Sequence, residues 1–508
     1  MFTGSLITVL ALLASPAGAV AALVLHLVGA TGFVLYGAGQ AHLLWYYLRR
    51  PRRGAPPPLP ADPREWPRVT VQVPMYNEQY VAALVIDACA ALEWPRDRFE
   101  LQLLDDSQDE TVAIVDERAA YWRARGVTVQ VVRRAERTGY KAGALAHGAT
   151  VATGEFHCLF DADFQPPPDF LTRAMGWFAD PTVGAVQGRW THRNREYSWL
   201  TRAQALVIDA FFVVEQEARD RAGLVLRFNG SAGIWRAAAV ADAGGWQADT
   251  LSEDYDLCLR AQLRGWRLVY DRDLVAPSEL PVTVHDYQVQ QARWARGRGQ
   301  VIRKLMGALV RAPWSRRVKA HALFDMLNIL VVPSILLLAL SAPWLEWGLR
   351  HQPQLKPWAS ASGLVQLPFN VLVLPAYLTI SLRLASGGLM DTVRLAARTV
   401  PAFLCLIMGV NGVIMTSGIA GLRNVSRTAV PFLRTTKYHL QSASDSWRGR
   451  RYRPGPVSAV TWFEGAWALF GVGALVMDAQ LGAWYWMPFH TFVAVGFGLM
   501  VSRGAGRS

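Results

Sequence analysis

The first charged side chain of this chain is Arg49, so everything before it forms one uncharged and largely apolar block. A helix needs about 20 residues to cross a bilayer, and the stretch 6–48 is longer than that. It can form a helical hairpin, or one tilted span preceded by a short interfacial piece that breaks at 15–18. We expect one span over residues 19–47. A cleavable signal is the alternative, but the block lacks the basic n-region of such signals.

Apolar segments return after residue 316. Candidate spans are 323–345, 365–382, 400–422, 457–479 and 484–501. If all of them crossed, the basic stretch 423–453 and the polar region before the first span would lie on opposite sides of the membrane. That arrangement conflicts with the tendency of Lys/Arg-rich loops to stay in the cytoplasm. We therefore assign 392–422 to an interfacial or re-entrant element, which leaves four true spans in this half of the chain.

The composition agrees with a membrane protein, because 52% of residues are hydrophobic and only 18% are charged. The net charge of +13 could indicate nucleic acid, but the arginines concentrate beside apolar segments, at 49–53 and 423–453. This pattern is typical of anchoring at a cytoplasmic face. We expect a multi-pass protein of the cell (inner) membrane that contacts the lipid bilayer and no nucleic acid. Buried thiols in a reducing compartment are expected for Cys89, Cys158, Cys258 and Cys405, which show no C-x-x-C spacing.

Between the apolar blocks the chain alternates short β-branched or apolar runs with helix-like segments. Strands are expected at 69–73, 100–104, 127–132 and 156–160, and helices at 79–92 and 110–125. This order predicts an α/β domain with a mostly parallel, Rossmann-like sheet, in which ligands bind beyond the carboxyl ends of the strands. The expected parts are an N-terminal membrane segment at 1–50, a Pro/Arg-rich linker at 51–65, the α/β domain at 66–285, amphipathic interfacial helices at 286–320, and a C-terminal membrane bundle at 321–508 with an interfacial loop at 423–455.

Polar clusters follow three of the expected strands. They are Pro74-Met75-Tyr76-Asn77-Glu78, Asp105-Asp106 and Asp161-Ala162-Asp163. The first cluster can place the ring of Tyr76 and the amide of Asn77 against a base and a ribose, or it is a plain strand-to-helix loop. Asp105 and Asp106 point to opposite sides of a strand. One of them can accept bonds from uracil or ribose while the other caps the next helix, and a simple cap is the alternative for each.

The third cluster suits a cation. In an extended segment Asp161 and Asp163 share a face and can converge on one metal ion. Because Mg²⁺ takes one or two carboxylates plus phosphate oxygens, we expect a divalent metal, Mg²⁺ or Mn²⁺, that holds a diphosphate; a solvated turn is the alternative. Lys141 lies in a turn that opens a predicted helix, where phosphate is attracted, although an ordinary helix start explains this turn equally well.

Two acidic residues, Glu253 and Asp254, follow Ser252 at another predicted helix start. A carboxylate there can deprotonate an acceptor hydroxyl as it attacks an anomeric carbon. The spacing does not choose between the two, and both can merely cap the helix. Direct displacement assisted by one base would invert the anomeric centre, so an α-linked sugar donor would give a β-linked product.

Gln290, Arg293 and Trp294 are spaced i, i+3 and i+4, which places them on one face of a helix. Arg293 can neutralise charge on a departing diphosphate, and the indole of Trp294 offers a flat surface for a sugar ring. The alternative is a basic amphipathic helix that lies on anionic lipid.

Taken together these clusters carry a family resemblance. The series Asp105-Asp106, Asp161-Ala162-Asp163, Ser252-Glu253-Asp254 and Gln290-Gln291-Ala292-Arg293-Trp294 resembles the D, D, D, Q-x-x-R-W signature of processive family 2 glycosyltransferases, the cellulose and hyaluronan synthase relatives. Within that group, residues 73–78, 137–145, 228–236 and 432–438 look most similar to bacterial cellulose-synthase-like proteins akin to plant A-type mannan synthases. The similarity runs from about residue 66 to 438.

The resemblance implies a GT-A fold and a nucleotide-diphosphate sugar donor, with a metal on Asp161 and Asp163. It implies Asp254 as the catalytic base, beside Glu253, and places Trp294 under the acceptor sugar at the mouth of a transmembrane channel. The implied residues for the sugar donor are Pro74, Tyr76, Asn77, Glu78, Asp105, Asp106, Lys141, Asp161, Gln290, Arg293 and Lys437. Those implied for the acceptor are Trp294, Asn229, Gly230 and Ser231.

Residues 432–437 are similar to the gating loop F-x-V-T-x-K of cellulose synthases, which closes over bound nucleotide. Three positions depart from the family pattern: Ser252 stands for Thr and keeps the hydroxyl, Arg434 replaces the Val of that loop, and Thr436 replaces the Pro of the mannan-like subgroup. A C-terminal PilZ-like domain is not expected, so neither is control by a cyclic dinucleotide in cis.

We therefore expect a membrane-integral, inverting, processive β-glycosyltransferase with a cytoplasmic catalytic domain. It would transfer hexose from UDP-glucose or GDP-mannose to a growing polysaccharide such as β-1,4-mannan or β-1,4-glucan. A non-processive transferase acting on a lipid carrier or a glycolipid acceptor is one alternative. A transporter or scaffold with a catalytically dead domain is another, and no residue pattern favours it.

Overall fold

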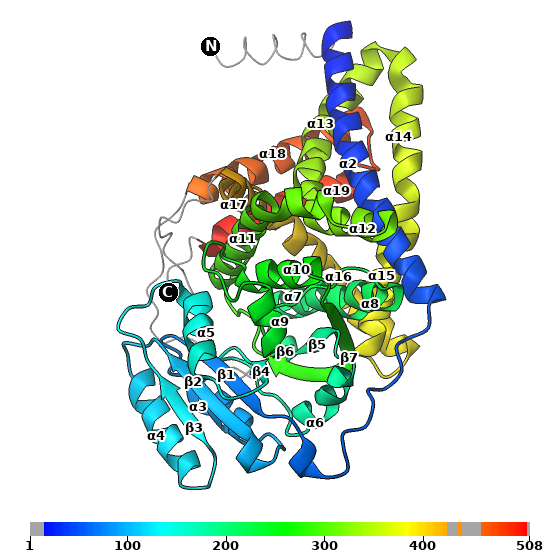
Figure 1. Ribbon diagram of the computed structural model, residues 1–508. Coiled ribbons are helices and arrows are strands. Elements are labelled where there is room, and N and C mark those ends of the chain that lie inside the picture. Colours follow the sequence, from blue (N-terminus) through cyan, green and yellow to red (C-terminus); the bar gives the residue numbers. More distant parts are fainter. Residues whose placement is uncertain (1–14, 424–434, 436, 439–444, 446–458, 505–508) are drawn as a thin grey trace.

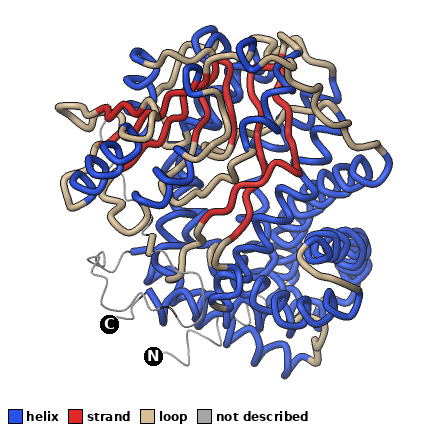
Figure 2. The backbone as a smooth tube through the Cα atoms, turned by 90° about the horizontal axis from the view of Figure 1, so that it is seen from below, coloured by secondary structure: helices blue, strands red, loops and turns tan. Residues whose placement is uncertain are grey.

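The computed structural model describes residues 15–423, 435, 437–438, 445 and 459–504. An α/β domain lies below a group of long helices in Figure 1. Figure 2, seen from below, shows the strands gathered on one side of the molecule and helices filling the other. Two chemically different parts, one built around a sheet and one helical, therefore share a single chain.

One seven-stranded sheet with the order β3-β2-β1-β4-β6-β5-β7 forms the centre of the α/β domain. Its strands are β1 (Val69–Met75), β2 (Phe99–Asp105), β3 (Val129–Val132), β4 (Phe156–Leu159), β5 (Val183–His192), β6 (Gly233–Arg236) and β7 (Arg267–Ser278). The pairs β1–β2, β1–β4, β2–β3 and β5–β7 are parallel, whereas β6 is antiparallel to both β4 and β5. The mostly parallel sheet predicted from the sequence is confirmed, and this mixed, Rossmann-like sheet is that of the GT-A fold.

The helices of this domain are α3 (Ala82–Ala90), α4 (Thr111–Arg123), α5 (Tyr140–Val151), α6 (Phe170–Ala174), α7 (Trp199–Asp209), the π-helix η5 (Ala210–Gln216), α8 (Glu217–Ala222), α9 (Ala237–Asp242) and α10 (Glu253–Leu263). The four short 3₁₀ turns are η1 (Pro63–Glu65), η2 (Arg96–Arg98), η3 (Met175–Ala179) and η4 (Arg195–Tyr197). The helices expected at 79–92 and 110–125 correspond to α3 and α4.

The sheet is covered on both faces, which explains its apolar strands. On one face the side chains of Val71, Leu101 and Leu103 are fully buried against Ile86 of α3. On the other face a second cluster joins Leu145 of α5 to the α10 helix. This packing fixes the first turns of α5 and α10 at the carboxyl edge of the central strands, where polar clusters follow β1, β2 and β4.

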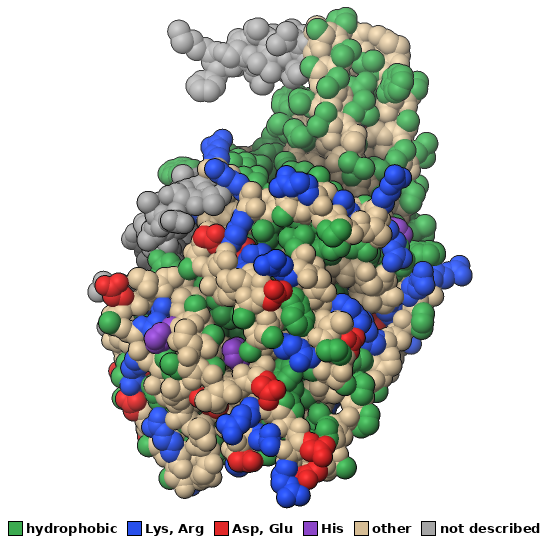
Figure 3. Space-filling view, in the orientation of Figure 1, with side chains coloured by type: hydrophobic (Ala, Val, Ile, Leu, Met, Phe, Trp, Pro, Cys, Tyr) green, Lys and Arg blue, Asp and Glu red, His purple; other side chains and the backbone are tan. Residues whose placement is uncertain are grey.

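The remaining elements are helical, and most of the longer ones are apolar. They are α2 (Pro16–Arg49), α11 (Val284–Arg311), α12 (Arg316–Leu327), η6 (Asn328–Leu330), α13 (Val331–His351), η7 (Pro353–Leu355), α14 (Lys356–Pro368), the π-helix η8 (Phe369–Val373), α15 (Leu374–Leu384), α16 (Leu389–Gly409), α17 (Asn411–Arg423), α18 (Ala459–Leu481) and α19 (Met487–Gly504). Figure 3 shows hydrophobic side chains over the upper helices and charged ones over the α/β domain, with Lys and Arg gathered where the two regions meet.

Five helical stretches within the described residues are long and apolar enough to cross a bilayer. They are Pro16–Arg49, Arg316–His351, Pro353–Leu384, Leu389–Arg423 and Val460–Leu481, and the apolar helix Met487–Ser502 is shorter. These stretches agree with a membrane protein, and α2 is one continuous helix. The stretch Leu389–Arg423 has the length and composition of a span, but its α16 part packs on α7 of the α/β domain. The interfacial or re-entrant assignment of 392–422 stays a prediction.

The cysteines are free thiols, and Cys89, Cys158 and Cys258 are buried as expected. The expectation is wrong for Cys405, which is only half-buried. On α16 this residue lies between Phe403 and Leu406, whose side chains fill the contact with α7. The thiol therefore lies beside that contact rather than inside it.

Candidate functional site

A cavity of about 490 Å³ opens at the carboxyl ends of β1, β2 and β4. Its walls come from α5, α10 and α11, together with Thr435 and Lys437 from the C-terminal part of the chain. The expected site residues that line it are Pro74, Tyr76, Glu78, Asp106, Lys141, Asp161, Asp163, Asn229, Glu253, Asp254, Gln290, Arg293, Trp294 and Lys437. The expected residues that do not line it are Asn77, Asp105, Gly230 and Ser231. Fold topology thus brings together side chains that are several hundred residues apart.

Asp161 and Asp163 do not lie in an extended segment, and that expectation is wrong. The segment is a turn, in which the backbone N–H of Phe164 donates to the carbonyl of Asp161 over 3.0 Å. The backbone N–H of Asp161 donates to the hydroxyl of Ser231 at 2.9 Å. A side-chain hydroxyl thus accepts the hydrogen bond in place of a backbone carbonyl of a neighbouring strand. The two carboxylates consequently reach the cavity from a turn and not from one face of a strand.

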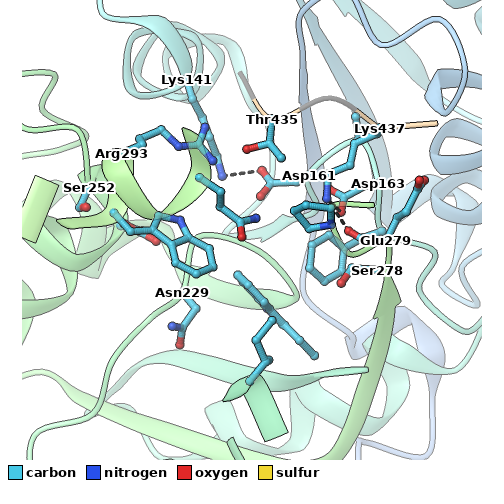
Figure 4. Close-up of a pocket in the computed structure, with 18 of the residues that line it drawn as sticks. Lys141, Asp161, Asp163, Asn229, Ser252, Ser278, Glu279, Arg293, Thr435 and Lys437 are labelled. Atoms are coloured by element: carbon cyan, nitrogen blue, oxygen red, sulfur yellow. Dashed lines mark hydrogen bonds and ion pairs between the residues drawn. The ribbon is translucent and has the colours of Figure 1, made fainter. Parts of the chain in front are cut away.

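Each of these carboxylates is bound by a different lysine (Figure 4). Lys141 donates to Asp161 Oδ1 at 2.5 Å and to the carbonyl of Gly230 at 2.9 Å. Lys437 donates to Asp163 Oδ2 at 2.7 Å. Both carboxylates therefore already attract cations, and both lysines lie where they can also meet the oxygens of a phosphate.

The donor set of this turn fits a hard divalent ion. Within the residues that the structure describes, no group of three His, Cys, Asp or Glu side chains is arranged to hold a metal. Mg²⁺ commonly binds through one or two carboxylates and completes its shell with substrate phosphates and water. Asp161 and Asp163 supply the carboxylates of that arrangement, and a diphosphate would supply the rest.

Asp254 has the electrostatic character of a base that works near neutral pH. It lies in the first turn of α10, where the N–H of Tyr255 donates to its Oδ1 at 2.8 Å. Burial and then the charge of Glu253 raise the pKa of Asp254 to about 7, whereas the ammonium of Lys141 opposes this shift. Glu253 itself lies 3.8 Å from the Lys141 ammonium. The arrangement favours Asp254 over Glu253 as the proton acceptor.

Gly230 is packed against Asp254. A Cβ at this position would lie 2.7 Å from Asp254 Oδ2, and the φ angle of +82° belongs to the left-handed region that favours glycine. Gly230 does not line the cavity. Because it has no side chain, it lets its loop approach the carboxylate of Asp254 closely.

The cavity lining also includes an aromatic and a basic group, Tyr76 and Arg137, which suit a nucleobase. The Arg137 guanidinium lies 3.4 Å from the ring centroid of Tyr76 and 4.9 Å from that of Tyr140. Arg134 donates through Nε to Asp106 Oδ1 at 3.0 Å and also binds the carbonyl of Thr138. Asp106 is thus linked to the turn that begins α5.

Asp105, unlike Asp106, does not line the cavity and bonds to neighbouring protein groups. It is buried, accepts a hydrogen bond from Arg133 Nε at 2.9 Å, and accepts another from the N–H of Ser107 at 3.0 Å. It does not cap the next helix, since α4 begins at Thr111, whose N–H donates to Asp109. The cap role expected for one of the pair is wrong because an irregular segment separates β2 from α4.

Gln290, Arg293 and Trp294 lie on one turn of α11 and all face the cavity. Trp294 is 37% exposed, so a ring can stack on its indole. Burial lowers the pKa of Arg293, and the carboxylates of Glu253 and Asp161 work in the opposite direction. This side chain is a buried cation near the carboxylate cluster.

From the C-terminal part of the chain, Thr435 and Lys437 line the cavity. The N–H of Tyr438 donates to Glu279 Oε1 at 3.0 Å, and Lys437 also binds the carbonyl of Glu279. Residues 432–434 and 436, which include Arg434 and Thr436, lie outside the described residues. The similarity of residues 432–437 to a gating loop therefore stays a prediction.

Several lining residues were not identified from the sequence. They are Trp190, Phe211, Glu215, Arg227 and Glu279. Arg227 directly precedes the motif at 228–236, and this position beside a recognised motif was a usable signal. Glu215 gave no signal, because it belongs to an apolar segment whose π-helix turns it toward the cavity.

The sequence of this chain is similar to those of known proteins. The profile of the family described as "Glycosyltransferase like family 2" matches residues 67–297. Glucomannan 4-beta-mannosyltransferase 2 of Arabidopsis thaliana is 44% identical over 251 residues, which cover 48% of this chain and 47% of the relative. Probable glucomannan 4-beta-mannosyltransferase 7 of Oryza sativa subsp. japonica is 35% identical over 402 residues, which cover 74% and 66%. The chain thus spans about half to two thirds of the length of these relatives.

A solved structure is also similar. Mannosyltransferase PcManGT from Pyrobaculum calidifontis, in complex with GDP-Man and Mn²⁺, shares 26% sequence identity with a TM-score of 0.47. The alignment covers 70% of this chain and 97% of that protein.

Proposed function

Because this chain is a glycosyltransferase of family 2 with a GT-A fold, we propose that it transfers mannose from GDP-mannose to a growing β-1,4-linked mannan or glucomannan. One observation carries the proposal: the turn of Asp161 and Asp163, the carboxylate of Asp254 and the indole of Trp294 line one cavity. The choice of mannose is supported by the activity named for relatives at 44% and 42% identity. UDP-glucose is the second sugar donor to test.

The proposed reaction is a single displacement. Asp254 takes the proton of an acceptor hydroxyl while that oxygen forms a bond to the anomeric carbon. The bond from the anomeric carbon to the diphosphate oxygen breaks, and GDP leaves with the electron pair. Attack from the face opposite the leaving group inverts the anomeric centre, so an α-linked mannosyl donor gives a β-linked product.

The leaving diphosphate needs positive charge, and the cavity supplies it from several elements. Lys141 from α5, Arg293 from α11 and Lys437 line the same space. Fixed cations stabilise charge that develops on a leaving group without having to reorganise. A divalent ion on Asp161 and Asp163 would add Lewis-acid stabilisation of the diphosphate when bound.

The acceptor is proposed to lie on Trp294 with its reactive hydroxyl toward Asp254. Asn229 lines this part of the cavity (Figure 4), and its Oδ1 is buried with no hydrogen-bond partner among the described residues. A buried acceptor atom without a partner is costly, and a sugar hydroxyl can satisfy it. Asn229 and Trp294 together would define the terminal acceptor sugar.

We further propose that transfer is processive, that the catalytic domain is cytoplasmic and that the membrane is the cell (inner) membrane. Support comes from the position of the cavity, whose wall on α11 lies next to the apolar helices. The proposed bacterial origin has no support in the relatives described above, which are plant proteins, and stays a prediction.

The test uses the full chain in membrane vesicles with radiolabelled GDP-mannose and UDP-glucose in parallel reactions. We expect label from GDP-mannose in a polymer that a β-1,4-mannanase degrades, with GDP as the second product. Asp254→Asn is the inactive control, and Asp242→Asn on α9 is the matched control, since Asp242 is not among the cavity-lining residues.

Label only from UDP-glucose would overturn the choice of mannose. A single sugar on a lipid would overturn processivity, and absence of nucleotide release would overturn enzymatic function.

A further inference from the structure

A buried cluster of charges lies beside the catalytic carboxylate, where the α/β domain meets the membrane helices. Its centre is Asp325 on α12, the helix that continues through η6 into α13; this residue is only 3% exposed. Arg227 donates through Nε to Asp325 Oδ2 at 2.8 Å and also reaches Oδ1. Arg219 lies 2.7 Å from Oδ1, and the hydroxyl of Tyr255 donates to Oδ2 at 3.0 Å. One carboxylate thus holds three buried side chains of the α/β domain.

Two of these partners are next to site residues along the chain. Tyr255 follows Asp254 in the first turn of α10. Arg227 precedes the loop that contains Asn229 and Gly230, and both Arg227 and Tyr255 line the cavity themselves. Asp325 therefore touches the helix that bears the base and the loop that faces the acceptor, while it belongs to a helix that leads into the membrane.

The charges of the cluster make Asp325 hard to replace. Arg298 also lines the cavity, and its pKa is lowered to about 10 by burial and then by the nearby guanidinium of Arg227. Positive charge is therefore in excess here, and Glu215 offsets part of it through Arg219 at 3.1 Å. Removing one partner of a buried ion pair leaves the other uncompensated. The guanidinium of Arg227 would then have to move or find another acceptor.

We propose that Asp325 is a positioning residue for sugar transfer, which sets the place of Asp254 through Tyr255 and the place of the Asn229 loop through Arg227. The inference rests on the proposed function of the cavity. Asp325 does not line the cavity, so it acts only through its partners. A displacement of about 1 Å in a reacting group can cost about a hundredfold in rate. Loss of the contact between Asp325 and Tyr255 or Arg227 should therefore be measurable as a lower kcat.

The experiment compares Asp325→Asn, Tyr255→Phe and the double variant as purified full-length proteins. We expect kcat for transfer to fall about tenfold to a hundredfold in Asp325→Asn and somewhat less in Tyr255→Phe. KM for GDP-mannose should stay within about twofold, because the expected nucleotide contacts at Tyr76 and Asp106 are on other elements. The double variant should lose less than the product of the two single losses, since both changes break one shared contact. Asp325→Glu should recover part of the lost kcat.

Asp478→Asn is the matched control. Asp478 is an equally buried carboxylate on the membrane helix α18, hydrogen-bonded to His490 at 2.6 Å, and it does not line the cavity. We expect this control to lower the melting temperature with unchanged kcat. An equal loss of kcat in the control, or a rise in KM at constant kcat in Asp325→Asn, would overturn the positioning role.

Two outcomes separate this inference from the proposed function. A wild-type protein that is inactive with GDP-mannose counts against the proposed sugar donor, and the comparison is then made with the nucleotide sugar it does use. A wild type that is active, beside variants with unchanged kcat, counts against Asp325 alone. If Asp325→Asn does not fold, Tyr255→Phe still removes the single hydrogen bond without leaving a buried charge unpaired.

Discussion

The raised pKa of Asp254 gives the reaction a definite dependence on pH. Burial and then the charge of Glu253 move this pKa from 3.8 to about 7. A general base works in its deprotonated form, and a raised pKa means that this form is lost as the pH falls through about 7. We expect kcat to drop about tenfold for each pH unit well below that midpoint and to level off above it. A carboxylate with an ordinary pKa would keep the rate constant down to about pH 5.

The assay measures initial transfer rates at saturating GDP-mannose from about pH 5 to pH 9, with folding checked at each pH. Glu253→Gln removes the neighbouring negative charge and should move the acid limb of the profile to lower pH. Asp254→Asn should lower transfer by about 10²- to 10⁴-fold while nucleotide binding is retained. Asp242→Asn should keep the wild-type profile. A flat profile across the acid range, or the same limb in Glu253→Gln, would refute the assignment of Asp254 as a base with a shifted pKa.

Other substitutions probe the remaining parts of the cavity. Asp163→Ala should remove the metal dependence of sugar-donor binding in a titration, and an unchanged metal titration would contradict metal binding by Asp161 and Asp163. Trp294→Ala should slow elongation by about three- to tenfold but leave hydrolysis of the sugar donor nearly unchanged, and equal losses in both reactions would argue against an acceptor platform. Gly230→Ala places a Cβ 2.7 Å from Asp254 Oδ2 at a φ of +82°, so transfer should fall at least about tenfold with nucleotide binding retained; a normal rate would show that the base tolerates displacement.

The mostly parallel sheet, and the edge of it at which the cavity opens, could be predicted from the sequence. Apolar runs of strand length alternate with helical segments, and a parallel sheet collects its functional residues at one edge. Spacing on a helix correctly predicted a shared face for Gln290, Arg293 and Trp294 because α-helical geometry is local. These inferences need only short-range periodicity and one general rule of topology.

Partners that are distant in the sequence could not be predicted. Asp105 and Asp106 look equivalent in the sequence, yet one is buried against Arg133 and the other faces the cavity beside Arg134. The turn at Asp161 depends on a hydroxyl 70 residues later. The loss of strand geometry at this point follows from the antiparallel insertion of β6, which carries the Ser231 loop to the end of β4. No local pattern encodes that insertion.

The ion pairs of the cavity distinguish the residues proposed to hold the sugar donor from the residue proposed as base. Asp106, Asp161 and Asp163 each bind a cation of this chain, namely Arg134, Lys141 and Lys437. A diphosphate and a divalent cation that enter together can exchange partners with these pairs, because phosphate takes the lysines and the carboxylates take the metal. Such an exchange conserves the balance of charge, so the two ligands should favour each other's binding. In the described part of the chain no salt bridge reaches Asp254. Burial and then the charge of Glu253 outweigh the opposing ammonium of Lys141 and raise the pKa of Asp254 to about 7, which is why it can accept a proton near neutral pH.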